Sequence, residues 1–227
     1  MKALTLFFCI LFSLPAITFA QTANEMLVKV TSAVESGQQG QAVSYFREAV
    51  SRDIDRSEMY YWTDVDKNSE VCPKLAAELV TVYKKSRNYD KAYLFYKELL
   101  QKNPNNIDYL LGCAEMEVSR GKEKEALNIY QQVLRLDADN LAANIYIGNY
   151  FYLKAESDKR QLESEYKKIT TPNRMQYARY RDRLQNLFAD GYGKAREYLQ
   201  NVVRMFPSTE AKKTLDKILI IEKEMNR

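Results

Sequence analysis

Residues 89–106 read YDKAYLFYKELLQKNPNN, and residues 123–140 read EKEALNIYQQVLRLDADN. Four positions match between the two stretches at a spacing of 34 residues: Ala92 and Ala126, Tyr96 and Tyr130, Leu99 and Val133, Asn106 and Asn140. Self-similarity at a fixed period of this length is typical of stacked helical pairs, because each pair buries its apolar face against the next. The sequence therefore predicts an all-α fold, an α-solenoid of helix–turn–helix repeats.

The two regular repeats cover residues 73–140. In each, apolar residues at helical spacing form a first helix, a short polar turn follows, and a second helix ends in an asparagine-containing stretch. The turns lie at residues 86–88 and at Gly121. Ala92 and Ala126 mark the place where the two helices of a pair cross closely, since a larger side chain there would push them apart.

These repeats resemble the tetratricopeptide repeat family. The resemblance is carried by Tyr89, Asp90, Lys91, Ala92, Tyr96, Leu99 and Pro104 in one repeat, and by Gly121, Ala126, Tyr130 and residues 137–140 in the next. The chain departs from the family pattern at Ala138, where proline is preferred, and at Glu117, where an aromatic residue is usual. The resemblance implies a solenoid whose first helices line a concave groove that binds other proteins.

Less regular segments flank the two repeats. A degenerate repeat is expected over residues 21–56, followed by a linker over residues 57–72. A third repeat-like unit covers residues 141–207, but its second helix is delayed by an insertion of 35 residues. Residues 208–227 are expected to close the solenoid as a capping helix, with Ser208 as its N-cap.

The insertion has the pattern of a helical hairpin over residues 157–190. Its two narrow apolar stripes are Leu162, Tyr166 and Ile169, then Tyr177, Tyr180, Leu184 and Leu187. Thr171 is expected to cap the second helix, with Pro172 as its first residue. The hairpin either extends beyond the solenoid or folds back on it. In the capping helix, the apolar residues 218–221 exceed one helical face, so we expect some of them to meet the hairpin or another chain.

The first 20 residues resemble a secretory signal peptide. Lys2 supplies a positive charge, residues 3–14 form a short apolar run, and small residues precede a cleavage position after Ala20. The run is shorter than the about 20 residues that a membrane-spanning helix needs, and no further spanning run follows. We expect an exported protein in the bacterial periplasm, with secretion or a place peripheral to the outer membrane as alternatives.

Composition argues against several classes of function. The chain has no histidine, which removes the commonest general base and the commonest metal ligand. Its net charge of +4 arises from mixed acidic and basic residues, as on a solvated surface, and does not indicate a nucleic-acid-binding face. No cofactor or metal is expected. Cys72 and Cys113 are interpreted as packing residues that lie too far apart for a disulfide.

Two local features each have a structural and a functional interpretation. Residues 64–70 place oxygen-bearing side chains at alternate positions, as calcium loops do, but lack the turn glycine and the final glutamate. We interpret them as a polar linker in which Asn68 or Ser69 caps the next helix. Trp62 has the chemistry to stack on a sugar or a partner chain, but we favour packing between the first two helical units.

The family resemblance places a set of residues in the concave groove. They are Lys74, Thr81, Lys84, Lys85, Asp108, Leu111, Glu115, Ile145, Tyr146, Asn149 and Tyr152. An ordinary solvated helix face would show polar residues at the same spacing. Tyr146 and Tyr152 favour binding, because aromatic residues with a polar group are common interface anchors.

The sequence therefore predicts a non-enzymatic scaffold or adaptor in the bacterial cell envelope, which binds a protein or peptide segment in this groove. One alternative is a carboxylate-dependent enzyme that acts on the cell wall or on a glycan. The other is a structural component that self-associates as a homo-oligomer through its C-terminal helix. No phosphate-binding loop, nucleophile elbow or metal motif supports the enzyme.

Overall fold

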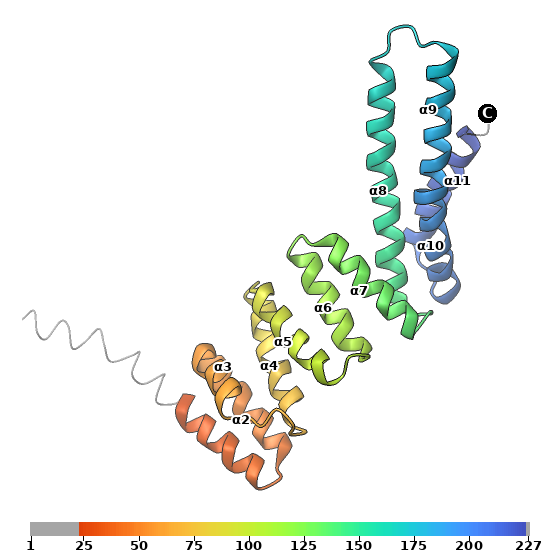
Figure 1. Cartoon of the computed structure of the whole chain (residues 1–227). Coiled ribbons are helices and arrows are strands. Elements are labelled where there is room, and N and C mark those ends of the chain that lie inside the picture. Colours follow the sequence, from red (N-terminus) through yellow and green to blue (C-terminus); the bar gives the residue numbers. More distant parts are fainter. Residues whose placement is uncertain (1–22, 226–227) are drawn as a thin grey trace, which may run out of the picture. The chain divides into compact units, whose positions relative to one another are not determined.

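The structure is a computed structural model that describes residues 23–225, and every regular element in that range is a helix (Figure 1). The chain divides into two compact units, unit 1 through Pro104 and unit 2 from Asn105. Each unit contains helical pairs joined by short turns, as the 34-residue period predicts. The predicted all-α solenoid with an inserted hairpin and a capping helix is confirmed.

Unit 1 contains two helical pairs and one additional helix. Its elements are a helix over residues 23–35, α2 (Gln39–Arg52), α3 (Ile54–Thr63), α4 (Cys72–Lys85) and α5 (Tyr89–Lys102). The additional helix, α3, contacts both α2 and α4. The segment expected as a linker, residues 57–72, is thus helical as far as Thr63.

The turns inside the helical pairs share one backbone feature. Gly37 and Gly121 have φ angles of 72° and 73°, and Arg87, at the position matching Gly121, has a φ angle of 58°. A left-handed backbone costs a residue with a side chain about 1–2 kcal/mol. The repeat therefore keeps its turn geometry even where the residue is not glycine.

Tyr61 packs α3 into the interior of unit 1. Its ring is fully buried, and its hydroxyl donates a hydrogen bond to Glu98 Oε2 at 2.8 Å and lies 3.2 Å from Cys72 Sγ. The Trp62 ring stacks on Phe95 with ring centroids 5.2 Å apart, although 45% of Trp62 stays exposed. Trp62 therefore packs on α5 with one part of its surface and leaves the other part exposed.

Glu58 joins three helices of unit 1 through a polar cluster. Its carboxylate accepts hydrogen bonds from Lys91 Nζ at 2.5 Å and from the Tyr83 hydroxyl. Burial acts to raise the pKa of Glu58, but the hydrogen bonds from Lys91 and Tyr83 outweigh it, so the pKa is lowered. Burial and the bond to Glu58 raise the pKa of Tyr83 to about 12. The cluster holds α3 against α4 and α5.

The start of α4 differs from the expectation. Its N-cap residue is Val71, which makes no side-chain hydrogen bond to the first turn. Asn68 and Ser69 lie in the preceding turn, where the backbone N–H of Asn68 donates to Asp66 Oδ1 at 2.8 Å. The prediction that Asn68 or Ser69 caps this helix is wrong. Pro73 in the first turn has no N–H group, so one of the donors that a cap would satisfy does not exist.

Unit 2 begins with a regular pair and continues with the longest helix of the described chain. Its elements are α6 (Ile107–Ser119), α7 (Glu123–Leu136), α8 (Leu141–Lys167), α9 (Arg174–Leu187), the π-helix η1 (Phe188–Gly193), α10 (Lys194–Met205) and α11 (Thr209–Met225). Asn106 and Asn140 are the N-caps of α6 and α8, where their side chains accept from Tyr109 N at 3.0 Å and from Ala143 N at 3.2 Å. The asparagine that repeats in the sequence thus marks where each first helix begins.

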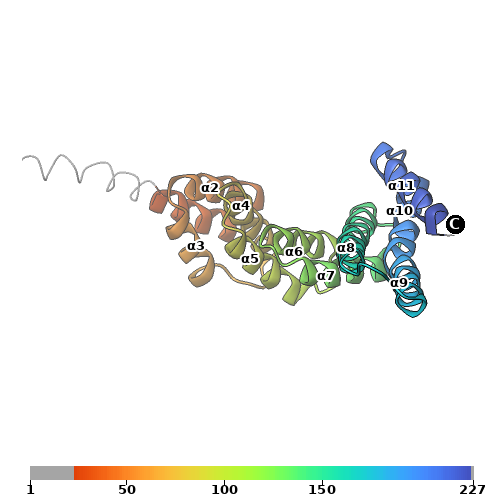
Figure 2. The same cartoon turned by 90° about the horizontal axis from the view of Figure 1, so that it is seen from above.

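The second half of α8 and all of α9 form an antiparallel hairpin, here called the arm (residues 156–187). Figures 1 and 2 both show the two helices side by side. Because α8 runs for 27 residues without interruption, the arm extends along the axis of α8 and does not fold back. Tyr166 stacks on Tyr180 with centroids 4.2 Å apart, and Arg183 forms an ion pair with Glu165 at 3.1 Å. These contacts brace the two helices of the arm against each other.

The second helix of the arm begins two residues later than expected. Asn173, not Thr171, is its N-cap: the Asn173 side chain accepts from Gln176 N at 2.8 Å, and the Gln176 side chain accepts from Asn173 N at 2.9 Å. Pro172 therefore lies outside the helix. The prediction is wrong because this reciprocal capping box satisfies two backbone donors, which a threonine cap followed by proline does not.

We expect Asn173→Ala to lower the stability of the arm by about 1 kcal/mol, because it removes one half of the capping box. Thr171→Ala is the matched control and is expected to change little. Amide hydrogen exchange in the first turn of α9 measures both effects. Equal protection in the two variants would contradict the assignment of Asn173 as the cap.

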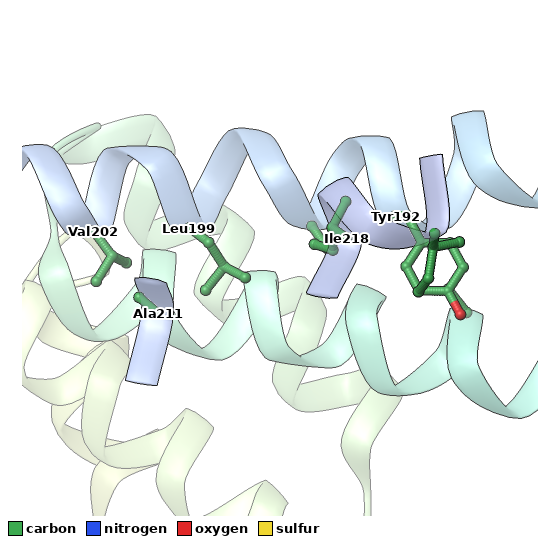
Figure 3. Packing of buried hydrophobic residues seen from close by; sticks show 8 residues of the cluster. Tyr192, Leu199, Val202, Ala211 and Ile218 are labelled. Atoms are coloured by element: carbon green, nitrogen blue, oxygen red, sulfur yellow. The ribbon is translucent and has the colours of Figure 1, made fainter. Parts of the chain in front are cut away.

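The arm joins the solenoid at a buried core (Figure 3). Its members are Ala155, Tyr192, Ala195, Leu199, Val202, Ala211, Ile218 and Ile221. Because α9, η1 and α10 follow one another without a break, η1 is a widened turn inside a longer helical run. Tyr192 in η1 is fully buried, and its hydroxyl donates to Glu156 Oε1 at 2.6 Å. Gly191 allows η1 to approach α8 closely, since a Cβ atom there would lie 2.6 Å from Ala155 Cβ.

The last helix, α11, covers this core. The side chain of Ser208 accepts from Ala211 N at 3.2 Å, which confirms Ser208 as the predicted cap. In the apolar run 218–221, the two outer residues are buried and the two inner ones are exposed. At the end of the helix, Arg181 of the arm donates to the carbonyl of Met225 at 2.5 Å. The helix therefore meets the arm at its end and leaves part of its apolar surface uncovered.

Candidate functional site

A groove of about 770 Å³ lies in unit 2, where α8 faces the α6–α7 pair. It is lined by Val118, Glu123, Tyr130, Ala142, Ile145, Tyr146, Asn149, Tyr150, Leu153, Lys154, Ser157 and Asp158. Because α8 continues into the arm, the groove reaches the base of the arm. Its volume is in the range of sites that hold small molecules or short peptide segments.

Three tyrosines form a stack along the groove, here called the tyrosine stack (Tyr130, Tyr146 and Tyr150). The ring centroids of Tyr130 and Tyr146 are 4.3 Å apart, and those of Tyr146 and Tyr150 are 6.4 Å apart. The hydroxyl of Tyr146 donates to the backbone carbonyl of Glu123 at 3.1 Å. Burial, assisted by the negative charge of Glu123, raises the pKa of Tyr146 to about 12. Tyr146 therefore stays neutral at physiological pH, and its ring and its hydrogen bond fix one wall of the groove.

Exposed apolar side chains lie beside the tyrosine stack. Val118 and Ile145 are partly exposed, and Leu153 is 64% exposed. At the arm end of the groove, Lys154 and Asp158 form an ion pair at 2.8 Å. Exposed apolar surface bordered by polar groups is typical of an interaction site.

Comparison with known proteins supports the repeat assignment. The family model described as tetratricopeptide repeat matches residues 83–146. A crystal structure described as a "putative protein binding protein" from Bacteroides ovatus ATCC 8483 is 65% identical, with 90% of this chain and 99% of that chain covered and a TM-score of 0.86. The chain belongs to the tetratricopeptide repeat family.

Two more distant solved structures carry the same family name. A tetratricopeptide repeat protein from Parabacteroides merdae ATCC 43184 is 14% identical, with 89% of this chain and 74% of that chain covered and a TM-score of 0.39. A thermophilic tetratricopeptide repeat protein from Thermus thermophilus is 15% identical, with 87% and 99% covered and a TM-score of 0.34. Among curated proteins, none matches the chain.

Eleven residues were predicted to line the groove from their positions in the tetratricopeptide pattern, here called the tetratricopeptide register. The structure brings three of them together. Ile145, Tyr146 and Asn149 line the groove on α8. Tyr152 does not, because its ring lies against the core with its centroid 6.0 Å from that of Tyr192. Three residues of α6 are not among the lining residues: Asp108, Leu111 and Glu115.

The other four residues of the tetratricopeptide register lie on α4 in unit 1. Lys74 Nζ donates to Gln39 Oε1 at 2.7 Å, and the Thr81 hydroxyl donates to the carbonyl four residues earlier at 2.8 Å. Lys84 and Lys85 lie in the last turn of α4. A role of these residues in binding stays a prediction.

The tetratricopeptide register missed the part of the groove that lies farther along α8. Tyr150 and Leu153 follow Tyr146 and Asn149 by four residues each, so they lie on the same helical face. They were missed because the register gave Tyr152 as the next groove residue, although its ring packs against the core. Extending the pattern by one turn would have found them.

Cys72 and Cys113 are both buried and no disulfide joins them, in agreement with packing roles. Within residues 23–225, no three histidine, cysteine, aspartate or glutamate side chains gather as potential metal ligands. In the same range, no helix has both the length and the apolar character needed to cross a membrane.

Proposed function

We propose that this protein is an interaction scaffold that binds a segment of another protein in the groove along α8. The tyrosine stack of Tyr130, Tyr146 and Tyr150 carries this proposal, because ordered aromatic rings offer a large contact area at low entropic cost. The solved Bacteroides ovatus relative, with its protein-binding description, supports the same class of function. Repeat folds in general present extended binding surfaces, which favours a non-enzymatic role.

The groove chemistry indicates how such a segment would bind. Apolar side chains of the partner would pack against the tyrosine stack and against Ile145 and Leu153. Polar groups at the groove ends, including the Lys154–Asp158 pair, would orient the segment. An extended or helical segment with two or three apolar residues fits this pattern.

We also propose that the scaffold acts in the bacterial cell envelope, in the periplasm or peripheral to the outer membrane, or as a secreted protein. The support is the signal-like sequence of residues 1–20, which lie outside the described residues. Fractionation of the native host tests this location. Recovery in the cytoplasm with residues 1–20 still attached would contradict it.

Photocrosslinking in the native host tests the groove. A photoreactive phenylalanine analogue is placed at Leu153 in the groove, at Leu219 on the apolar face of α11, or at Val28 as an exposed apolar control in unit 1. We expect one defined crosslinked partner from Leu153 and none from Val28. When Tyr146→Ala is added to the chain that carries the photoreactive residue in place of Leu153, we expect about tenfold less of that product. This is the usual effect of truncating a central interface aromatic.

Three outcomes would contradict the groove proposal. One is the same product from Val28 and Leu153, and another is an undiminished product with Tyr146→Ala in a chain whose helical content is unchanged. The third is a product with twice the mass of the chain from Leu219 alone, which would favour the self-associating component.

A further inference from the structure

The outer end of the arm concentrates the positive charge of the chain. Residues 167–183 contain six basic side chains, Lys167, Lys168, Arg174, Arg179, Arg181 and Arg183, and one acidic side chain, Asp182. This segment therefore has a net charge of +5, whereas the complete chain has +4. The rest of the chain is close to neutral, so the charge is a local property of the arm.

Three of these cations are available at the turn of the arm. Lys167, Lys168 and Arg174 are exposed, and none of their side chains forms an ion pair or hydrogen bond within residues 23–225. Arg181 and Arg183, farther from the turn, are engaged in the contacts described above. We call residues 167–177 the tip.

Exposed apolar side chains lie among the cations of the tip. Met175 is 64% exposed and Tyr177 is 51% exposed, both in the first turns of α9. The sequence pattern places Tyr177 in the stripe that faces α8, but the Tyr166–Tyr180 pair fills that seam and Tyr177 stays outside. The sulfur of Met175 accepts from Arg179 Nη2 at 3.6 Å, but most of Met175 and about half of Tyr177 stay uncovered by the arm.

The tip is ordered and projects from the fold. The Asn173–Gln176 capping box fixes its turn, and the tyrosine pair of the arm lies directly behind it. The end of α11 reaches the arm at Arg181, so the tip extends past the capping helix (Figure 1). A protruding end of this kind can contact a broad surface.

We propose that the tip binds the surface of an anionic lipid membrane. Lys167, Lys168 and Arg174 face acidic headgroups, while Met175 and Tyr177 enter the boundary between headgroups and acyl chains. Tyrosine is favoured at that boundary because it has an apolar ring and a polar hydroxyl. An acidic protein would pair with the same cations, and the comparison of vesicles with soluble polyglutamate described below distinguishes it from a membrane. This inference is independent of what binds in the groove.

Vesicle co-sedimentation tests the proposal. The chain over residues 21–227, which contains every described helix and lacks the apolar leader, is mixed with vesicles of phosphatidylglycerol and phosphatidylcholine, or of phosphatidylcholine alone. We expect binding to the mixed vesicles at low salt, weaker binding as salt is added, and little binding to phosphatidylcholine alone. The triple variant Lys167→Gln, Lys168→Gln, Arg174→Gln is expected to bind at least about tenfold more weakly, since each cation near such a surface contributes roughly fivefold.

A matched control separates the tip from overall charge. The variant Lys212→Gln, Lys213→Gln, Lys217→Gln removes the same charge from exposed positions of α11 and is expected to bind within about twofold of the parent. The pair Met175→Ser, Tyr177→Ser is expected to weaken the binding that persists at higher salt, where apolar insertion dominates.

Several results would overturn the proposal. One is the absence of binding to anionic vesicles at low salt. Another is that the two triple variants weaken binding to these vesicles equally. Binding to soluble polyglutamate as tight as to vesicles, and insensitive to Met175→Ser, Tyr177→Ser, would assign the tip to an acidic protein instead.

Discussion

Tyr192→Ala is expected to lower the free energy of unfolding of unit 2 by about 3–5 kcal/mol, the range for removing a large buried aromatic side chain. The Tyr192 ring is fully buried, with its centroid 6.0 Å from that of Tyr152 and 5.8 Å from that of Phe188. It lies where η1 packs on α8, so the surrounding helices would fill the resulting cavity only in part.

Urea unfolding followed by circular dichroism measures this effect. Tyr177→Ala removes the same side chain from an exposed position and is expected to stay within about 0.5 kcal/mol of the parent. Tyr192→Phe keeps the ring but removes the hydrogen bond to Glu156, at an expected cost of about 1 kcal/mol. Unfolding of Tyr192→Ala and Tyr177→Ala at the same urea concentration would show that Tyr192 is not a core residue.

Gly191→Ala is expected to destabilise unit 2 by about 1–3 kcal/mol, because it adds an atom where no space exists. The new Cβ would lie 2.6 Å from Ala155 Cβ and 3.5 Å from Ala155 Cα. Neither neighbour can rotate away, so the backbone of η1 or of α8 must move. The substitution is small but costly, because two helix backbones must move apart, whereas flexible side chains could rotate out of the way.

Two further variants make the Gly191 prediction specific. Gly40→Ala adds a methyl group with nothing within 4 Å, so its stability is expected to be unchanged or slightly raised. Adding Ala155→Gly to Gly191→Ala removes the clashing atom, and the double variant should be more stable than the sum of the single effects implies. Strict additivity of the two substitutions in thermal unfolding would refute the close approach.

The regular part of the fold follows from sequence because several local signals agree there. Asn106 and Asn140 repeat because each caps a first helix, and Gly121 supplies the left-handed turn between helices. Ala92 and Ala126 are fully buried, as expected for positions where paired helices cross. Each of these signals depends only on neighbours in the same repeat, which is why they could be predicted.

The remaining features depend on contacts between segments far apart in the chain. No local pattern predicts η1, because its position depends on the close packing of Gly191 against Ala155 of another helix. Tyr177 follows the apolar spacing of α9 but is left outside by the Tyr166–Tyr180 pair. The groove was predicted only in part. Its residues on α8 share one helical face and follow from the spacing, whereas the length of α8 depends on the inserted arm.

The π-helix has a consequence for how the arm could be inserted at all. A hairpin of arbitrary length would return the chain to the solenoid at an arbitrary rotation about the helix axis, because successive residues differ by about 100°. A wide turn takes in one extra residue and resets that rotation, so that Ala195, Leu199 and Val202 face the core of unit 2. The wide turn thereby matches this arm length to the packing of the repeat beneath it: one residue more or fewer in the arm would turn α10 by about 100° away from the core unless a second wide turn or its loss compensated.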